Sequence, residues 1–162
     1  MAMTGKAAVT LPSDTEILIT REFDAPRRLV YRAWTTPELV RRWWSGHRGE
    51  MTVVEIDLRV GGRWRYVMVT NGGRQVAFHG EYQEIVPDER LVHTEIFEMP
   101  GAPEGDPAVN EVTFSEVDGR TTLSLLARAP SRQVRDAIME SGMEAGMQEQ
   151  MDLLEELARS LR

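Results

Sequence analysis

The residues best suited to acid–base chemistry are His93 and Glu95, two positions apart in a predicted strand over 91–98. Alternation places both side chains on one face of that strand, together with Leu91 and Phe97. Burial in a cavity shifts such pKa values toward neutrality, which suits general acid–base catalysis. Side chains two apart on a strand stand about 7 Å from each other, so the two need not touch. A structural or surface role for His93 is the alternative interpretation.

Other catalytic chemistries find little support in the sequence. The three histidines, His47, His79 and His93, lie in separate predicted elements and lack the paired spacing of a zinc site. The chain has no cysteine, which excludes thiol nucleophiles and disulfides. The glycine pairs at 61–62 and 72–73 neither precede a helix nor lead into the Gly-Lys-Ser/Thr of a phosphate-binding loop. The sequence therefore predicts no metal site, no cofactor and no established set of catalytic residues.

Aromatic and methionine side chains favour a different function, the binding of an apolar or aromatic small molecule. Trp64, Tyr66 and Met68 alternate onto one face of a predicted strand. Trp43 and Trp44 are consecutive in a helical segment, so only one of them can face inward, and the sequence leaves open which. Filling of the core is the alternative role for the apolar candidates. The candidate ligand-binding residues are Trp34, Trp43, Trp64, Tyr66, Met68, Phe78, His93, Phe97, Met143, Met147, Gln150 and Met151.

The elements that position these residues follow from periodicity and turn residues. Residues 15–23 are rich in β-formers, and Pro26 and Pro37 each stand at the start of a short amphipathic helix. From 51 to 129 the apolar period changes to two, with hairpin turns at 71–73 and 118–119 and a long loop over 99–108. Strands joined this closely must be antiparallel. Residues 131–161 predict a helix that kinks or breaks at Ser141-Gly142.

This order of elements predicts an α+β fold, with a curved antiparallel sheet of about seven strands and two short helices after the first strand. One apolar face of a twisted sheet needs cover, and only the C-terminal helix is long enough to supply it. That helix carries Met143, Met147, Met151 and glycines where bulky branched residues would pack closely, which leaves room for a cavity. We expect residues 1–13 to be a flexible tail and residues 14–162 to be a single ligand-binding domain.

Seven segments, taken in order, resemble one known family. They are Arg21-Glu22-Phe23-Asp24-Ala25-Pro26, Ala33-Trp34-Thr35-Thr36-Pro37-Glu38, Arg42-Trp43-Trp44, Asp57-Leu58-Arg59-Val60-Gly61-Gly62-Arg63-Trp64, Phe78-His79-Gly80-Glu81-Tyr82, Pro87-Asp88-Glu89-Arg90-Leu91 and Ser141-Gly142-Met143-Glu144-Ala145-Gly146-Met147. Across roughly residues 15–160 the chain resembles the START-like, or SRPBCC, superfamily, and within it the bacterial branch related to the activator of heat-shock protein 90 ATPase.

The resemblance implies a helix-grip fold, in which the sheet wraps around the C-terminal helix and encloses an apolar cavity. Relatives use that cavity for lipids, polyketides, hormones and other small molecules, and share no catalytic residue set. The eukaryotic chaperone-activating members contact the chaperone through this kind of domain. Many relatives continue from the paired tryptophans into a Gly-Pro loop, where this chain has Ser45-Gly46-His47-Arg48-Gly49 near the expected cavity mouth.

The composition of the chain indicates which classes of partner are disfavoured. The net charge of −7 disfavours nucleic acids and anionic membranes. No apolar run reaches the length of a membrane span, and residues 1–13 lack the apolar core of a signal peptide, so we expect a cytoplasmic protein.

Three functions are ranked. Binding of an apolar or aromatic small molecule comes first, so an enzyme is the less expected outcome. A cavity enzyme of the cyclase, dehydratase or hydrolase type, using His93, Glu95, Tyr66 and Gln150, comes second. A chaperone-interacting or stress-response module comes third, and a homodimer is compatible with the sequence.

Overall fold

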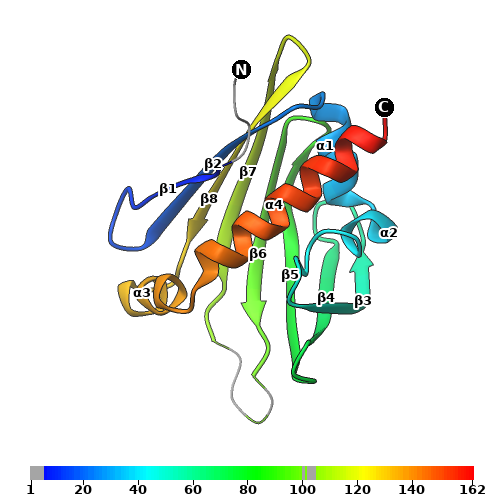
Figure 1. Cartoon of the computed structure of the whole chain (residues 1–162). Coiled ribbons are helices and arrows are strands. Elements are labelled where there is room, and N and C mark those ends of the chain that lie inside the picture. The colour runs from blue at the N-terminus through cyan, green and yellow to red at the C-terminus, as the bar shows by residue number, and fades with distance from the viewer. Residues whose placement is uncertain (1–5, 100, 102–104) are drawn as a thin grey trace.

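The computed structural model describes residues 6–99, 101 and 105–162, which form an α+β fold (Figure 1). The strands are β1 (Ala8–Thr10), β2 (Glu16–Phe23), β3 (Gly49–Ile56), β4 (Arg63–Thr70), β5 (Gln75–Val86), β6 (Arg90–Phe97), β7 (Ala108–Val117) and β8 (Arg120–Arg128). The helices are α1 (Arg27–Thr35), α2 (Pro37–Val40), α3 (Arg132–Glu140) and α4 (Met143–Ser160). Figure 1 shows α4 running diagonally across one face of the sheet, which we call the inner face.

All neighbouring strands pair antiparallel, in the order β1-β2-β8-β7-β6-β5-β4-β3. After β2, the chain passes through α1 and α2 to the far edge of the sheet. It then returns strand by strand until β8 pairs with β2. The short connections of this meander leave no room for the crossovers that parallel strands require.

The sheet has eight strands in the described residues, where the sequence predicted about seven. The additional strand is β1, which lies within the expected flexible tail, so that expectation does not hold for residues 8–10. Val9 pairs with Ile19 of β2, and Gln148 of α4 exchanges two hydrogen bonds with the backbone of Ala7, at 3.1 and 3.0 Å. β1 is three residues long, too short to show strand alternation by itself; it forms a hairpin with β2, whereas Gln148 is 141 residues away from Ala7. Residues 1–5 of the tail, and 100 and 102–104 of the expected loop over 99–108, lie outside the described residues.

Two predicted backbone features are confirmed. The C-terminal helical segment breaks at Ser141-Gly142, where Gly142 has a φ of 80° and separates α3 from α4. The turn between β7 and β8 has positive φ at both Asp118 (53°) and Gly119 (76°). Two positive φ values are the signature of a tight two-residue hairpin turn, which the Asp-Gly pair predicts.

The larger core cluster lies where α1 and the C-terminal half of α4 cover β2, β6, β7 and β8. Leu91, Val112, Leu123 and Leu154 are completely buried in it. A second cluster joins α2 to β3, β4 and β5 through a smaller group of side chains. Its buried members are Val40, Met51, Val54, Trp64, Tyr66 and Tyr82, and the half-buried Trp44 packs against both clusters.

A buried arginine fixes α4 to the sheet. The Arg21 guanidinium, on the inner face of β2, lies 2.8 Å from Asp152 Oδ1 and 3.0 Å from Glu155 Oε1. The other Glu155 oxygen accepts a hydrogen bond from the backbone N–H of Asp24 at 2.8 Å. The C-terminal half of α4 is therefore attached to β2 by ionic contacts as well as by apolar packing.

Candidate functional site

Burial on the inner face decreases along the strands. Near α1, Leu91 of β6 and Leu123 of β8 are completely buried. Farther along the same strands, His93 and Leu125 are half-buried, and Phe97 is 46% exposed. On α4, Met143 is likewise half-buried, whereas Leu154 is completely covered. The inner face is therefore sealed at the end near α1 and more open at the end where β6 finishes and α4 begins.

A continuous row of ring contacts runs over the β3–β6 half of the inner face. Successive ring centroids lie 5.2, 5.3, 5.3, 4.8, 5.4 and 6.0 Å apart, all within the range of favourable ring contacts. The row leads from the exposed Phe97 to Tyr82, which is almost completely buried. In order, its members are Phe97, Phe78, Trp44, Tyr66, Trp64, His93 and Tyr82, and we call this set the aromatic row.

The structure decides which of the two consecutive tryptophans faces the row. Trp43 is buried in the larger core cluster, where its Nε1 donates to the Ala33 carbonyl at 2.9 Å. Trp44 joins the row through Tyr66 and Phe78. Gln150 of α4 donates to the Trp44 carbonyl oxygen and so holds that residue against the helix.

The segment after Trp44 is also held on α4. Glu149 Oε1 accepts a hydrogen bond from the backbone N–H of His47 at 3.2 Å and lies 3.5 Å from Arg48 Nε. Gly46 has a φ of 59°, and a Cβ there would lie 3.1 Å from the same carboxylate oxygen. Glycine therefore suits this position, because it permits both the backbone conformation and the close approach of Glu149.

Polar side chains gather beside the buried end of the aromatic row. His93 pairs in register with Tyr82 on one side and with Asn110 on the other. Asn110 Nδ2 donates to Glu95 Oε1 at 3.0 Å, and His93 Nδ1 lies 3.4 Å from the Thr94 carbonyl oxygen. Adjacent strands thus bring His93 and Glu95 into one polar group with Asn110, in which Glu95 bonds to Asn110 and His93 lies against the Thr94 carbonyl.

Burial shifts the pKa values of this polar group. Desolvation lowers the pKa of His93 to about 4 and raises the pKa of the Glu95 carboxyl. It also raises the pKa of the Tyr82 hydroxyl, and that of Tyr66 well above its ordinary value, with smaller contributions to Tyr66 from Tyr82 and Glu95. At neutral pH, His93 is therefore an uncharged imidazole.

Some atoms of this group remain open although their residues lie deep in the fold. Within the described residues, no hydrogen bond is made by the Tyr66 and Tyr82 hydroxyls or by Glu95 Oε2. In the described residues, the side-chain nitrogen and oxygen atoms that are fully buried and also lack a hydrogen bond do not include any of these three atoms. They therefore face space that solvent can enter, and Glu95 and His93 keep part of their accessible surface.

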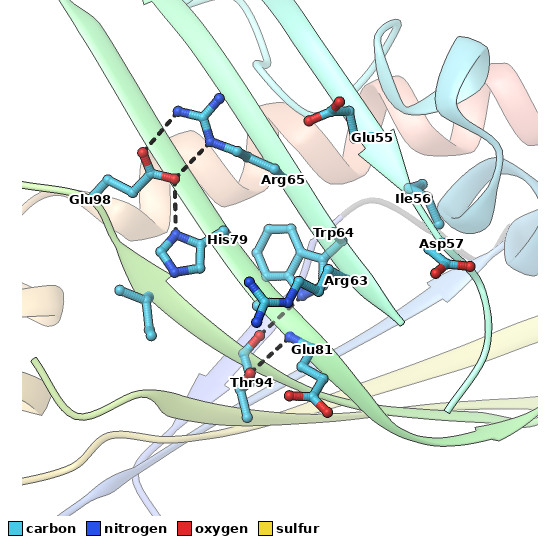
Figure 2. Close-up of a pocket in the computed structure, with 12 residues that line it drawn as sticks. Glu55, Ile56, Asp57, Arg63, Trp64, Arg65, His79, Glu81, Thr94 and Glu98 are labelled. Atoms are coloured by element: carbon cyan, nitrogen blue, oxygen red, sulfur yellow. Dashed lines mark hydrogen bonds and ion pairs between the residues drawn. The ribbon is translucent and has the colours of Figure 1, made fainter. Parts of the chain in front are cut away.

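The opposite face of the same strands carries a depression of about 620 Å³ (Figure 2). Figure 2 shows three of its polar side chains bonded to one another: Arg65 donates two hydrogen bonds of 2.9 Å to Glu98, and His79 Nδ1 lies 2.9 Å from the same carboxylate. These hydrogen bonds, led by Arg65, lower the pKa of Glu98 to about 2. The depression is lined by Glu55, Ile56, Asp57, Arg63, Trp64, Arg65, His79, Gly80, Glu81, Thr94, Ile96 and Glu98.

Trp64 links the two faces at a gap in the sheet. Its indole Nε1 donates to the Thr94 carbonyl at 3.1 Å, across the position of Gly80. A Cβ on Gly80 would lie 1.8 Å from that carbonyl oxygen, so only glycine fits. The candidate site lies on the inner face, where the aromatic row borders the polar group of His93, Glu95 and Asn110.

The predicted site residues divide into two sets. The structure brings together Trp64, Tyr66, Phe78, His93 and Phe97 in the aromatic row, and the half-buried Met68 packs against the same cluster. The others pack in or against the larger core cluster or bond to the backbone. These are Trp34, Trp43, Met143, Met147 and Met151, and Gln150 through its bond to Trp44.

Two residues of the site, Tyr82 and Asn110, are absent from the sequence-based candidates, and of the two consecutive tryptophans, between which the sequence left the choice open, it is Trp44 that joins the site. Asn110 had a usable signal, because it is a polar residue between Ala108 and Val112 on an otherwise apolar strand face. Such an inward polar residue requires a buried partner.

The described residues contain no group of three histidine or acidic side chains that could hold a metal ion. None of the helices in the described ranges is long and apolar enough to cross a bilayer.

The family of the chain follows from comparison with known proteins. Residues 24–159 match the family described as activator of Hsp90 ATPase homolog 1-like protein. The chain belongs to this family. Its START-like, helix-grip fold agrees with that assignment, and the family is compatible with a ligand-binding or an activator module.

Solved structures show the same fold. A protein from Rhodobacter sphaeroides is 24% identical, with a TM-score of 0.87 over 97% of this chain and 100% of its own. A protein from Chromobacterium violaceum is 28% identical, with a TM-score of 0.78 over 90% of this chain and 98% of its own. An AHSA1-like protein from Aeromonas hydrophila is 21% identical, with a TM-score of 0.67 over 89% of this chain and 93% of its own. No curated protein matches the chain.

Proposed function

We propose that the protein binds an aromatic or apolar small molecule on the inner face of its sheet, between the aromatic row and the N-terminal half of α4. The observation that carries this proposal is the aromatic row itself, which begins at the exposed Phe97 and ends beside the solvent-accessible polar atoms of Tyr82 and Glu95. Aromatic side chains offer large contact areas and lose few rotamers on binding. An apolar surface with a few convergent polar groups is the usual composition of a small-molecule site.

The fold supports this location by leaving one end of the inner face incompletely packed. Natural interiors are close-packed, so half-buried apolar side chains that face a covering helix mark a surface available to a ligand. Met68, Phe78 and Leu125 have this property, whereas Leu91 and Leu123 on the same sheet do not. Family membership supports the same location, since the resemblance implies a cavity between sheet and helix.

A fluorescence titration with a neutral dye tests the proposal. The probe is 6-propionyl-2-dimethylaminonaphthalene, whose emission shifts to the blue on leaving water. We expect saturable binding and a blue shift with the wild-type protein. Absence of saturable binding by the folded protein would refute the proposal.

A variant that fills the site gives the structural control. Ala108 is half-buried and pairs directly with Glu95, so a larger side chain there projects onto the inner face beside it. We expect Ala108→Phe to weaken dye binding at least about tenfold. Ser115→Phe, at an exposed position on the opposite face of the same strand, should leave binding unchanged. Equal affinities for wild type and a folded Ala108→Phe variant would place the dye elsewhere.

A further inference from the structure

The polar end of the site carries a carboxyl group and no basic side chain of its own. The aromatic row together with Glu95 and Asn110 contains one carboxyl group and neither arginine nor lysine. Glu95 receives a single hydrogen bond, from Asn110 to Oε1, and its Oε2 has no partner within the described residues. An ionised carboxylate accepts about four hydrogen bonds, so Glu95 has unused capacity that points into accessible space.

The surroundings of Glu95 favour a positive charge on the ligand. Aromatic rings attract cations through their electron-rich faces, and the effect strengthens where water is excluded. Trp64 of β4 and Tyr82 of β5 supply such rings beside His93, and Tyr66 of β4 lies near enough to Glu95 for the carboxylate charge to raise the pKa of its hydroxyl. A ligand carboxylate would instead meet Glu95 as a like charge in a partly desolvated place, which is unfavourable.

We propose that the ligand is an aromatic molecule that carries a protonated amine, with the ammonium group against Glu95 Oε2 and the aromatic body along the row. This inference rests on the proposed function and adds the chemical class of the ligand. Asn110 is the positioning residue, because its hydrogen bond to Oε1 orients the carboxylate and leaves Oε2 toward the ligand.

The titratable neighbours of Glu95 do not oppose this arrangement. His93, on the same strand, is uncharged at neutral pH because burial lowers its pKa to about 4. Tyr66 and Tyr82, from β4 and β5, have raised pKa values and stay neutral, so their hydroxyls can accept from or donate to a ligand. Burial raises the pKa of Glu95, and an ammonium partner shifts it back toward the ionised form.

Three probes of one shape test the inference: 1-naphthylmethylamine, 1-naphthylmethanol and 1-naphthoic acid, titrated by calorimetry at neutral pH. A charge-assisted hydrogen bond predicts that the amine binds about tenfold to a hundredfold more tightly than the alcohol. The acid should bind most weakly. In Glu95→Gln, which keeps an oxygen for Asn110, the ratio of amine affinity to alcohol affinity should fall to about one.

Glu81→Gln is the matched control, because Glu81 is an exposed carboxylate on the opposite face of the adjacent strand. This variant removes the same negative charge as Glu95→Gln, but outside the proposed site. It should keep the full amine preference. If the wild type binds amine and alcohol equally, or if Glu95→Gln retains the preference, the inference about the ligand is overturned while the binding function stands. If the folded wild type binds none of the probes and also fails to bind the neutral dye, the proposed function itself fails, and the inference with it.

Discussion

Replacing Arg21 with methionine should destabilise the protein by about 2–3 kcal/mol, because this residue fixes α4 to the sheet. The Arg21 side chain is 1% exposed and contacts Glu155 and Asp152 at 3.0 and 2.8 Å. Methionine retains most of the apolar volume of the arginine stem, so the change tests the ionic contacts rather than the packing.

The magnitude follows from how deeply each partner is buried. Removing one member of a buried ion pair costs about 3–5 kcal/mol when the other stays buried. Glu155, at 13% exposure, is in that situation, whereas Asp152 is 58% exposed and its contact belongs with surface pairs, which contribute about 0–1 kcal/mol. Two features reduce the loss. Within the described part of the chain Arg21 Nε is buried without a hydrogen bond, and Glu155 keeps its bond from the Asp24 N–H.

Urea unfolding monitored by circular dichroism measures this loss, and in a thermal scan it should appear as a decrease in Tm of about 4–12 °C. Arg59→Met is the matched control. Arg59 is 69% exposed and pairs with Asp57, itself 53% exposed, at 2.8 Å, so its replacement should cost no more than about 1 kcal/mol. Equal losses for the two variants, or a loss below about 1 kcal/mol for Arg21→Met, would refute the assignment of Arg21 as the anchor of α4.

Two further predictions concern His93 and Gly80. The folded pKa of His93 is about 4, below its ordinary 6.5, so the native state loses up to about 3 kcal/mol as pH falls through that window, and His93→Phe should remove this part of the pH dependence. The free energy of unfolding of wild type and His93→Phe is measured from pH 7 to pH 4. Glu95 is present in both proteins and its raised pKa stabilises the native state as pH falls, so the difference between the two profiles reports His93 alone. Identical profiles would contradict the prediction. Gly80→Ala places a Cβ 1.8 Å from the Thr94 carbonyl oxygen and should destabilise by more than about 3 kcal/mol, whereas Gly72→Ala, in open surroundings, should be nearly neutral by the same urea assay.

Local rules in the sequence predict much of the architecture. Alternation places Trp64 and Tyr66 together on one face, and both are buried there. The Asp118-Gly119 pair predicts the tight turn between β7 and β8, and Gly142 predicts the break between α3 and α4. These features depend on the period of the backbone and on the few residues that accept positive φ, so neighbouring residues are enough to specify them.

The candidate site depends on contacts that local rules cannot contain. Periodicity places His93 and Glu95 on one face but does not show that Asn110, from the next strand, binds the carboxylate. It leaves Trp43 and Trp44 equivalent, and only tertiary packing places Trp43 in the larger core cluster and Trp44 in the aromatic row.

The chain by itself determines the order of its elements, the faces of its strands and the family to which it belongs. The tertiary structure alone decides the burial of Arg21 beside Glu155, the contact of Gln148 with Ala7, and the shifted pKa values of His93 and Glu95. The physical reason is that desolvation and ion pairing depend on distances between segments far apart in sequence, whereas strand and turn patterns depend on neighbours along the backbone.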